Sequence, residues 1–293
     1  MPSLALGISL ILSLIAPALQ APAVPGLESR VRQLIGASGA EVAVAMRTLD
    51  GRDELLLDPD KRFHAASTMK VPIMVELFRQ AEAGTLRLDE TLDVKNEFHS
   101  IVDGSIYQLS VGDDSDAEVY AHIGKPMTLR ALCEAMITVS SNFAANLLIE
   151  KVGGENVRKT VSRLGADGML VRRGVEDQKA FDKGLNNETT ARALEVLMVA
   201  IARGQAVSPK ADAEMAAILK RQKFADAIPA GLPPGTAVGH KTGTITKIHH
   251  DAAIVYGPRP YVLVVLVRGI ADQKVSGPLI ASISREVWNE LSK

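Results

Sequence analysis

Segments with the alternating pattern of β-strands lie near the two ends of this chain, and segments with helical periodicity lie between them. The strand-like segments are residues 41–49, 54–57, 236–244, 252–256 and 261–268. Asp50-Gly51 has the composition of a hairpin turn between the first two. Strands so far apart in sequence share a sheet only if the ends of the chain meet. The order therefore favours an α+β fold, with an antiparallel sheet assembled from both chain ends and an all-helical subdomain inserted between them.

Helical periodicity also marks the segments that should cover this sheet. Residues 27–36 and 278–291 predict terminal helices that flank it. The interior helical segments are 129–138, 144–152, 156–164 and 189–203. The stretch 93–124 is rich in Asp, Ser and Gly and predicts a long irregular region. We expect one domain over residues 24–293, with an α/β part at about 24–66 and 223–293 and a helical part at about 67–222.

The first residues differ in composition from the rest of the chain. Residues 1–24 carry no charged side chain, and small residues follow the apolar run 4–19. We interpret residues 1–23 as a secretory signal peptide, which predicts an exported protein, periplasmic or secreted. A membrane anchor is the alternative, but the run is short for a span and Pro17 interrupts it. We expect no stable membrane insertion after cleavage.

Charge and cysteine content exclude several classes of function. The 293 residues have a formal net charge of −1, so no general attraction to nucleic acid is expected. The single cysteine, Cys133, cannot form an internal disulfide and lies in an amphipathic helical pattern, typical of a small buried side chain. Neither Cys nor His residues cluster at metal-ligand spacing, so the sequence predicts no metal and no cofactor.

One serine and one lysine lie three residues apart at the head of an apolar helical run. In F-H-A-A-S-T-M-K-V-P-I-M these are Ser67 and Lys70, and residues at this spacing share a helix face. A serine hydroxyl becomes a nucleophile when a base takes its proton. Lysine is such a base only when burial or a nearby cation lowers its pKa. Taken alone, the pair is more simply a helix cap and a solvated lysine.

Two later motifs make the catalytic interpretation stronger. V-S-S-N-F-A-A-N places Ser140 and Asn142 directly after the predicted helix 129–138. H-K-T-G-T, which contains Lys241 and Gly243, lies on a strand-like stretch. The chain thus contains Ser-x-x-Lys, Ser-x-Asn and Lys-Thr-Gly in that order.

With these motifs the chain resembles the penicillin-recognising serine hydrolases, and among them the class A serine β-lactamases. The resemblance extends over nearly the whole predicted domain. It implies that Ser67 is acylated, that Lys70 accepts its proton, that Ser140 passes a proton to the leaving nitrogen, and that Lys241 keeps the site electropositive. It implies substrate contacts through Asn142, Thr242 and Thr244. The backbone N–H groups of Ser67 and Thr244 would form the oxyanion hole, with Gly243 allowing close approach of the strand.

Turnover by the family needs a further base on the loop after the helical subdomain. Glu176 lies 36 residues after Ser140, which matches the family spacing, although the Leu-Asn that usually follows is absent. Glu176 is the first candidate, Asp177 the second and Glu188 the third. Leu185-Asn186-Asn187 comes later and has another possible role, fixing the loop. Arg172 or Arg173 is expected to tie the loop to an acidic residue near its end.

Other family positions are also altered. Many members carry an Arg on the strand after Lys-Thr-Gly, where this chain has Lys247, His249 and His250. We expect His250 to contact the substrate carboxylate, with a pH-dependent charge. Tyr107 or Tyr120 is a candidate aromatic wall of the site. Where some members have a disulfide, Cys133 faces Met74, so a buried free thiol is expected.

The resemblance implies hydrolysis of the β-lactam ring of penicillins and cephalosporins through an acyl-serine, giving antibiotic resistance, by a monomer that binds a small-molecule substrate. Three alternatives stay open at this stage. A D,D-peptidase shares the nucleophile chemistry. A penicillin-binding or sensor protein would be acylated once and hold the ligand. An esterase on the same scaffold would use the same serine.

Overall fold

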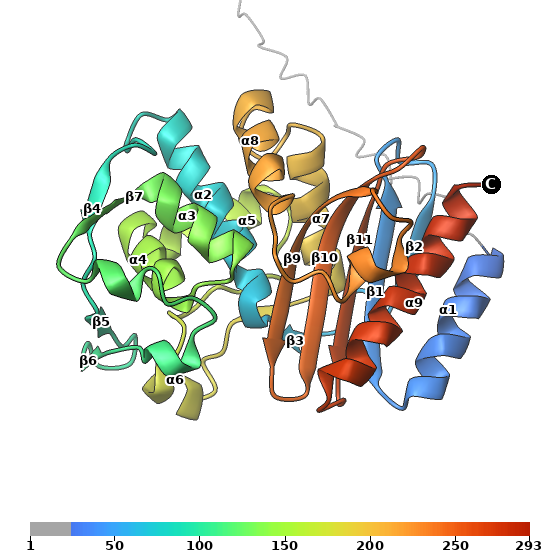
Figure 1. Cartoon of the computed structure of the whole chain (residues 1–293), viewed down its shortest axis with the longest axis horizontal. Helices are drawn as coiled ribbons and strands as arrows, with labels where there is room; N and C mark the ends of the chain where they lie inside the picture. The colour runs from blue at the N-terminus through green and yellow to red at the C-terminus, as the bar shows by residue number, and fades with distance from the viewer. Residues whose placement is uncertain (1–24) are drawn as a thin grey trace, which may run out of the picture.

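The computed structural model describes residues 25–293, so the expected signal peptide, residues 1–23, lies outside the described residues. The described part is a five-stranded antiparallel sheet beside a group of helices (Figure 1). The strand order is β2-β1-β11-β10-β9, so the N-terminal strands β2 and β1 join the C-terminal strands through the antiparallel pairing of β1 with β11. This confirms the predicted α+β architecture. The strands are β1 (Glu41–Thr48), β2 (Glu54–Leu57), β9 (Ala237–Ile245), β10 (Ile248–Tyr256) and β11 (Tyr261–Arg268).

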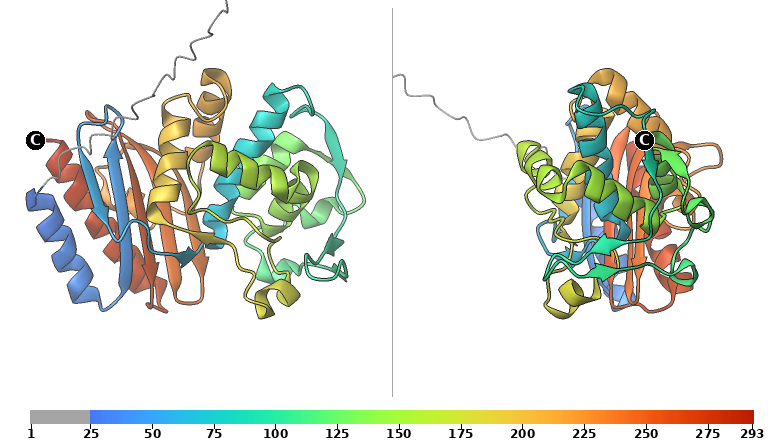
Figure 2. Two further views of the ribbon diagram at one scale, coloured as in Figure 1. Left: turned by 180° about the vertical axis from the view of Figure 1, so that it is seen from behind. Right: turned by 90° about the vertical axis from the view of Figure 1, so that its left-hand side faces the viewer.

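Both faces of the sheet are covered, because side chains alternate between two apolar layers. Val44, Met46 and Val265 pack under the terminal helices α1 (Pro25–Ser38) and α9 (Gln273–Leu291). Ala45 and Val264 belong to the larger core on the other face. There α7 (Ala191–Ala202) contacts β1, β10 and β11 and lies between the sheet and the helical part (Figure 2).

The helical part is built around a central apolar helix, α2 (Lys70–Glu82), whose residues from Lys70 to Phe78 are all buried. It contacts α3, α4, α5 and α8. The other helices are α3 (Leu129–Thr138), α4 (Asn142–Val152), α5 (Gly154–Arg163), α6 (Gln178–Asp182) and α8 (Pro209–Leu219). Cys133 on α3 is a fully buried free thiol, as expected, and Met74 on α2 is fully buried as well.

Short elements connect these parts and shape the rim of the site. They include small two-stranded pairs and single helical turns. One such pair and two such turns make up part of the region 93–124, which is predicted to be irregular. The pairs are β3 (Phe63–His64) with β8 (Glu188–Thr189), β4 (Thr91–Asp93) with β7 (Pro126–Thr128), and β5 (Phe98–His99) with β6 (Ile106–Tyr107). The 3₁₀ turns are η1 (Ala66–Met69), η2 (Val111–Asp113), η3 (Tyr120–His122) and η4 (Ile228–Gly231).

Several element boundaries differ from the sequence prediction for local reasons. The closing helix begins at Gln273 and not at Pro278, because the Asp272 side chain accepts the Lys274 N–H at 2.8 Å and caps it earlier. The helix predicted at 144–152 begins at Asn142, because Ser141 caps it through the Ala144 N–H. Asn142 is therefore a helical residue and not a loop residue.

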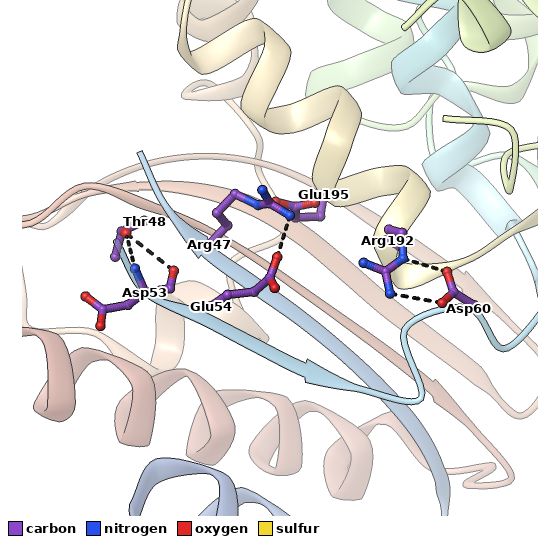
Figure 3. Close-up of polar contacts among 7 residues, drawn as sticks. All are labelled: Arg47, Thr48, Asp53, Glu54, Asp60, Arg192 and Glu195. Atoms are coloured by element: carbon purple, nitrogen blue, oxygen red, sulfur yellow. Dashed lines mark hydrogen bonds and ion pairs between the residues drawn. The ribbon is translucent and has the colours of Figure 1, made fainter. Parts of the chain in front are cut away.

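A buried ionic cluster joins α7 to the edge of the sheet (Figure 3). Arg47 on β1 pairs with Glu54 on β2, and its Nε lies 2.5 Å from Glu195 on α7. Glu195 is 1% exposed, and burial raises its pKa. Nearby, Arg192 pairs with the exposed Asp60 at 2.7 Å. Arg47 thus bridges two carboxylates between helix and sheet. Over residues 25–293, none of the helices combines the length and apolar character needed to cross a bilayer.

Candidate active site

Ser67 and Lys70 lie where the helical part meets the sheet. Ser67 is in the turn η1, and Lys70 is the first residue of α2. The Lys70 ammonium nitrogen lies 3.1 Å from the Ser67 hydroxyl oxygen. The turn is held by the Thr68 hydroxyl, which donates to the Ala65 carbonyl at 2.6 Å. The predicted pairing of serine and lysine on one face is confirmed.

Lys70 is fully buried and surrounded by neutral acceptors. Besides Ser67, its Nζ lies 2.6 Å from the Ser140 carbonyl oxygen, 3.2 Å from the Ser140 hydroxyl and 2.8 Å from Asn142 Oδ1. Burial lowers the pKa of Lys70 to about 7, although the negative charges of Asp114 and Glu176 act in the opposite direction. A substantial fraction of this lysine is therefore uncharged near neutral pH.

Ser140 lies between the two lysines of the site. Its hydroxyl oxygen is 3.0 Å from Nζ of Lys241, which comes from β9, and 3.2 Å from Nζ of Lys70. Lys241 is also fully buried, and burial followed by the charge of Lys70 holds its pKa well below the ordinary value. The Ser140 hydroxyl can therefore exchange protons with either amine.

Asn142, at the start of α4, connects Lys70 to the candidate base. Its side-chain oxygen accepts from Lys70, and its Nδ2 donates to a Glu176 carboxylate oxygen at 3.2 Å. Glu176 is half-buried, and burial raises the pKa of its carboxyl group. Of the three acidic candidates for a base, Glu176 is the one bonded to this cluster.

The loop that carries Glu176 is held by hydrogen bonds where its two ends meet and again next to Glu176. Leu170 and Glu188 exchange backbone hydrogen bonds of 2.8 and 3.0 Å, and Arg172 pairs with Glu188 at 3.0 Å. The Asn146 side chain donates to the Val175 carbonyl at 2.9 Å and accepts its N–H at 2.6 Å. These contacts fix the residue directly before Glu176. The expected tie by Arg172 is confirmed.

Asn187 fixes the same loop from its other end. Its side-chain oxygen accepts the N–H groups of Arg172 and Arg173 at 2.7 and 3.0 Å, and its Nδ2 donates to the Arg173 carbonyl at 3.0 Å. The role considered for the displaced Leu-Asn-Asn segment, holding the loop, is thus confirmed for Asn187.

The other acidic candidates are engaged elsewhere. Asp177 caps α6 and accepts from the Ser100 hydroxyl at 2.8 Å and the Ile101 N–H at 2.9 Å. Glu188 pairs with Arg62 and Arg172. Neither carboxylate is free to activate a water molecule at Ser67.

β9 is the edge strand of the sheet, and it passes very close to the serine turn. A Cβ atom on Gly243 would lie 3.1 Å from the Ser67 nitrogen and 3.0 Å from Thr68 Cγ2. A larger residue would push the strand away from Ser67. The expectation that glycine permits this approach is confirmed.

Two cavities meet at Ser67. They share Ser67, Asp113, Asn142 and Thr244. One, of about 530 Å³, extends toward Phe224, His249 and Gln273. The other, of about 520 Å³, extends under the loop toward Glu176 and Phe181. A bicyclic or peptide-like substrate can therefore contact Ser67 and extend to both sides of it.

The backbone is strained at three points of the site. Among residues 25–293, the non-glycine residues with positive φ are Asp58, Ala66, Ser140, Glu176 and Lys247. Ala66, Ser140 and Glu176 have φ of 46°, 60° and 64°, and each adjoins or belongs to the catalytic cluster. Such strain persists only where the surroundings over-determine it, and it is typical of functional sites.

Comparison with known proteins decides the family. The sequence model of the "Beta-lactamase enzyme family" matches residues 26–291. The chain belongs to this family. It is an enzyme of the serine β-lactamase type, with the mixed α/β fold of class A-like members.

Relatives and solved structures agree with this membership. The β-lactamase of Bacillus licheniformis is 30% identical over 247 residues, which cover 80% of this chain and 74% of the relative. β-Lactamase AST-1 of Nocardia asteroides is 29% identical over 272 residues, covering 90% and 83%. The structure of PBP-A superposes with a TM-score of 0.81 at 25% identity, covering 93% and 98%. An ancestral class A β-lactamase gives a TM-score of 0.78 at 26% identity, covering 90% and 99%.

One expected β-lactamase contact is wrong. His250 is fully buried and lies outside both cavities, where its ring packs edge-on against Phe63. Its Nε2 donates to the His64 carbonyl at 3.0 Å, and its Nδ1 accepts the Val267 N–H at 3.1 Å. Burial lowers its pKa to about 4, so it offers no charge to a substrate.

His249 replaces it at the cleft. Neighbouring strand residues point to opposite faces, and the β9–β10 register places His249 opposite Thr244. Its Nδ1 lies 2.9 Å from the Ser276 hydroxyl, and burial lowers its pKa. Strand alternation means that only one of the two adjacent histidines can face the cleft. The register set by the turn between β9 and β10 decides that this residue is His249.

Neither tyrosine forms a wall of the two cavities. The Tyr107 hydroxyl accepts a hydrogen bond of 3.3 Å from the Asn146 side chain, which also holds the Glu176 loop. The Tyr120 ring packs on the Phe143 ring, with 4.6 Å between the ring centroids. The expectation that one of them forms an aromatic wall of the site is therefore wrong; both tyrosines contact residues of α4 instead. Among the described residues, no group of three or more His, Cys, Asp or Glu side chains is arranged to hold a metal ion.

Proposed function

We propose that this protein hydrolyses the β-lactam amide of penicillins and cephalosporins through an acyl-enzyme at Ser67. The observation that carries the proposal is the Lys70 Nζ at 3.1 Å from the Ser67 hydroxyl, in a buried environment with neutral acceptors. A lysine with a pKa of about 7 supplies a free amine at physiological pH. That amine is the base that a serine nucleophile needs.

In acylation, the Ser67 oxygen attacks the lactam carbonyl carbon and its proton passes to Lys70. The resulting oxyanion is stabilised by the backbone N–H groups of Ser67 and Thr244. As the carbon–nitrogen bond breaks, the ring nitrogen takes a proton from the Ser140 hydroxyl. Ser140 recovers a proton from Lys70 across 3.2 Å, and Lys241 at 3.0 Å stabilises the transient alkoxide.

In deacylation, Glu176 takes a proton from a water molecule as that water attacks the acyl carbon. As the acyl bond breaks, the Ser67 oxygen takes a proton from Lys70. This proton is the one that Glu176 took from water and passed on through Lys70, so both groups end in their starting states and the free enzyme is restored. The Asn142 amide, 3.2 Å from Glu176, orients the carboxylate. The raised pKa of Glu176 makes it a stronger base than an exposed glutamate.

Substrate binding uses both cavities. The hydroxyls of Thr242 and Thr244, together with His249, contact the carboxylate of the substrate on the side of Phe224 and Gln273. Asn142 donates to the acyl side chain, which extends under the Glu176 loop.

One observation favours a second candidate, a D,D-peptidase or a penicillin-binding protein without turnover. The PBP-A structures superpose at TM-scores of 0.81 and 0.80, and one of them is an acyl-enzyme complex with penicillin G. The two functions share acylation and differ in whether Glu176 completes turnover. The fate of the acyl-enzyme therefore separates them.

The test is intact-protein mass spectrometry after mixing mature protein with benzylpenicillin, sampled from seconds to hours. We expect a Ser67-dependent adduct that disappears as hydrolysed penicillin forms, and none with Ser67→Ala. Glu176→Gln should prolong the adduct by a factor of roughly 10² to 10⁴, the usual contribution of a general base. Glu155→Gln, at an exposed position on α5, is the matched control and should turn over normally. A persistent wild-type adduct indicates the penicillin-binding function, and absence of both adduct and product points to an esterase.

We also propose that the protein is exported as a monomer and gives its host resistance to β-lactams. The uncharged apolar segment at residues 1–23 supports export. Expression in a susceptible bacterium, with and without residues 2–23, tests this. Resistance that requires the segment supports the proposal, and resistance independent of it contradicts export.

A further inference from the structure

The N-terminus of α4 is held by a carboxylate from a distant segment. Asp114 accepts the Asn142 N–H at 2.9 and 3.0 Å through its two oxygens, and the Phe143 N–H at 2.9 Å. The first N–H groups of a helix have no partner within the helix. Ser141 satisfies the Ala144 N–H at 3.2 Å. Asp114 thus completes the cap and fixes the backbone of Asn142.

The segment that carries Asp114 contacts the chain on both sides of Ser140. The Ser115 hydroxyl donates to the Val139 carbonyl at 2.6 Å, at the end of α3. The Tyr120 hydroxyl donates to Asp114 at 3.3 Å, and its ring packs on Phe143. Ser115 therefore binds the residue directly before Ser140, and Asp114 binds the residues two and three positions after it; the backbone of Ser140 itself is strained. This clamp holds the Ser140 carbonyl and the Asn142 amide around the Lys70 ammonium group.

We propose that Asp114 is a positioning residue for proton transfer at Lys70, which it serves through the α4 cap and through its negative charge behind Asn142. The inference rests on the proposed acylation of Ser67. It assigns to Asp114 a role in the reaction that the three motifs do not include.

The charge of Asp114 acts on Lys70 together with burial and the charge of Glu176. Burial disfavours the protonated lysine, whereas Asp114 and Glu176 favour it, and the charge of Lys70 in turn lowers the pKa of Lys241. Asp114 also raises the pKa of Glu176, as does Asp113 at the rim. Loss of the Asp114 charge therefore lowers the pKa of both Lys70 and Glu176. Because the base must be deprotonated, the acidic limb of acylation should then move to lower pH.

The test measures the second-order rate constant of acylation by benzylpenicillin between about pH 5 and pH 9, with adduct formation followed by mass spectrometry. Asp114→Asn keeps the shape of the side chain but removes its charge. We expect acylation to slow by about tenfold or more on the alkaline plateau, because the proton acceptor is misplaced. The acidic limb should move down by about half a pH unit or more.

Asp116→Asn is the matched control, since its carboxylate bonds to the Glu118 and Val119 N–H groups of its own segment. It removes the same charge from the same segment and should keep the wild-type profile. Thermal unfolding of Asp114→Asn checks that the variant is folded. If the acidic limb of the Asp114→Asn acylation profile stays at the wild-type pH, the proposal is overturned, whatever the rate on the plateau. A wild-type protein without a Ser67 adduct instead overturns the proposed function.

Discussion

The side-chain oxygen of Asn142 lies 2.8 Å from the Lys70 ammonium nitrogen. The nitrogen of the same amide donates to Glu176 at 3.2 Å. One side chain therefore contacts both the base assigned to acylation and the base assigned to deacylation. An amide suits this place because it accepts on one side and donates on the other without adding charge.

This relationship predicts the effect of Asn142→Asp. A carboxylate of the same shape beside Lys70 favours the protonated lysine and raises its pKa above about 7. Acylation requires the free amine, so its acidic limb should move to higher pH by about one unit or more. The rate constant of acylation, measured against pH, checks this. A limb at or below the wild-type position would argue against Lys70 as the base.

Ser140→Gly and Ser140→Ala separate the hydroxyl from the strained backbone. Both variants remove the oxygen that lies 3.0 Å from Lys241 and 3.2 Å from Lys70, so both should lower acylation by roughly 10² to 10⁴. Only glycine tolerates the φ of 60° without strain. Thermal unfolding should therefore show the glycine variant to be at least as stable as the alanine variant. If either variant acylates at the wild-type rate, Ser140 is not the proton relay.

Arg47→Met should destabilise the fold without changing the catalytic cluster. It leaves the carboxylates of Glu54 and Glu195 close together without their cation (Figure 3). Removing one partner of a buried pair costs on the order of 3 kcal/mol. Because the folded-state pKa of Glu195 is raised, protonation relieves the defect. The loss in the free energy of unfolding, measured in urea, should thus be smaller at about pH 5 than at pH 7.5.

Arg192→Met is the matched control for this comparison. Its partner Asp60 is 68% exposed, and exposed ion pairs contribute about 0 to 1 kcal/mol. The control should lose less stability than Arg47→Met at either pH. Equal losses in the two variants would show that the buried cluster has no special role.

His249→Gln should weaken substrate binding most at low pH. Burial lowers the pKa of His249, so its ring is mainly neutral at pH 7 and gains charge only under acidic conditions. The dissociation constant of benzylpenicillin is measured in a Ser67→Ala background. The ratio between variant and parent should be about fivefold near pH 5.5 and should approach one above pH 7.5. Because variant and parent are compared at the same pH, the titration of all other groups affects both dissociation constants equally and cancels in their ratio.

His122→Gln, on the exposed turn η3, is the control for this measurement. Its ratio to the parent should be the same at every pH. A constant ratio for His249→Gln as well would mean that another group contacts the carboxylate.

The sequence by itself determined the sheet from two chain ends, the helical insertion and the residues of the three motifs. Period-2 and helical patterns are local, and a Ser-x-x-Lys spacing places two side chains on one face wherever the helix lies. Glu176 was identified through the family resemblance, because it matches the family's spacing from Ser140.

The tertiary structure alone decided which groups meet across long distances in sequence. The choice of His249 over His250 depends on the register after β9, where a shift of one residue reverses every side chain. The capping of α4 by Asp114 joins segments separated by 28 residues, and no local pattern in an irregular Asp-rich stretch distinguishes this aspartate from Asp113 or Asp116. The lowered pKa of Lys70 likewise arises from burial by α4 and β9, which a sequence pattern does not measure.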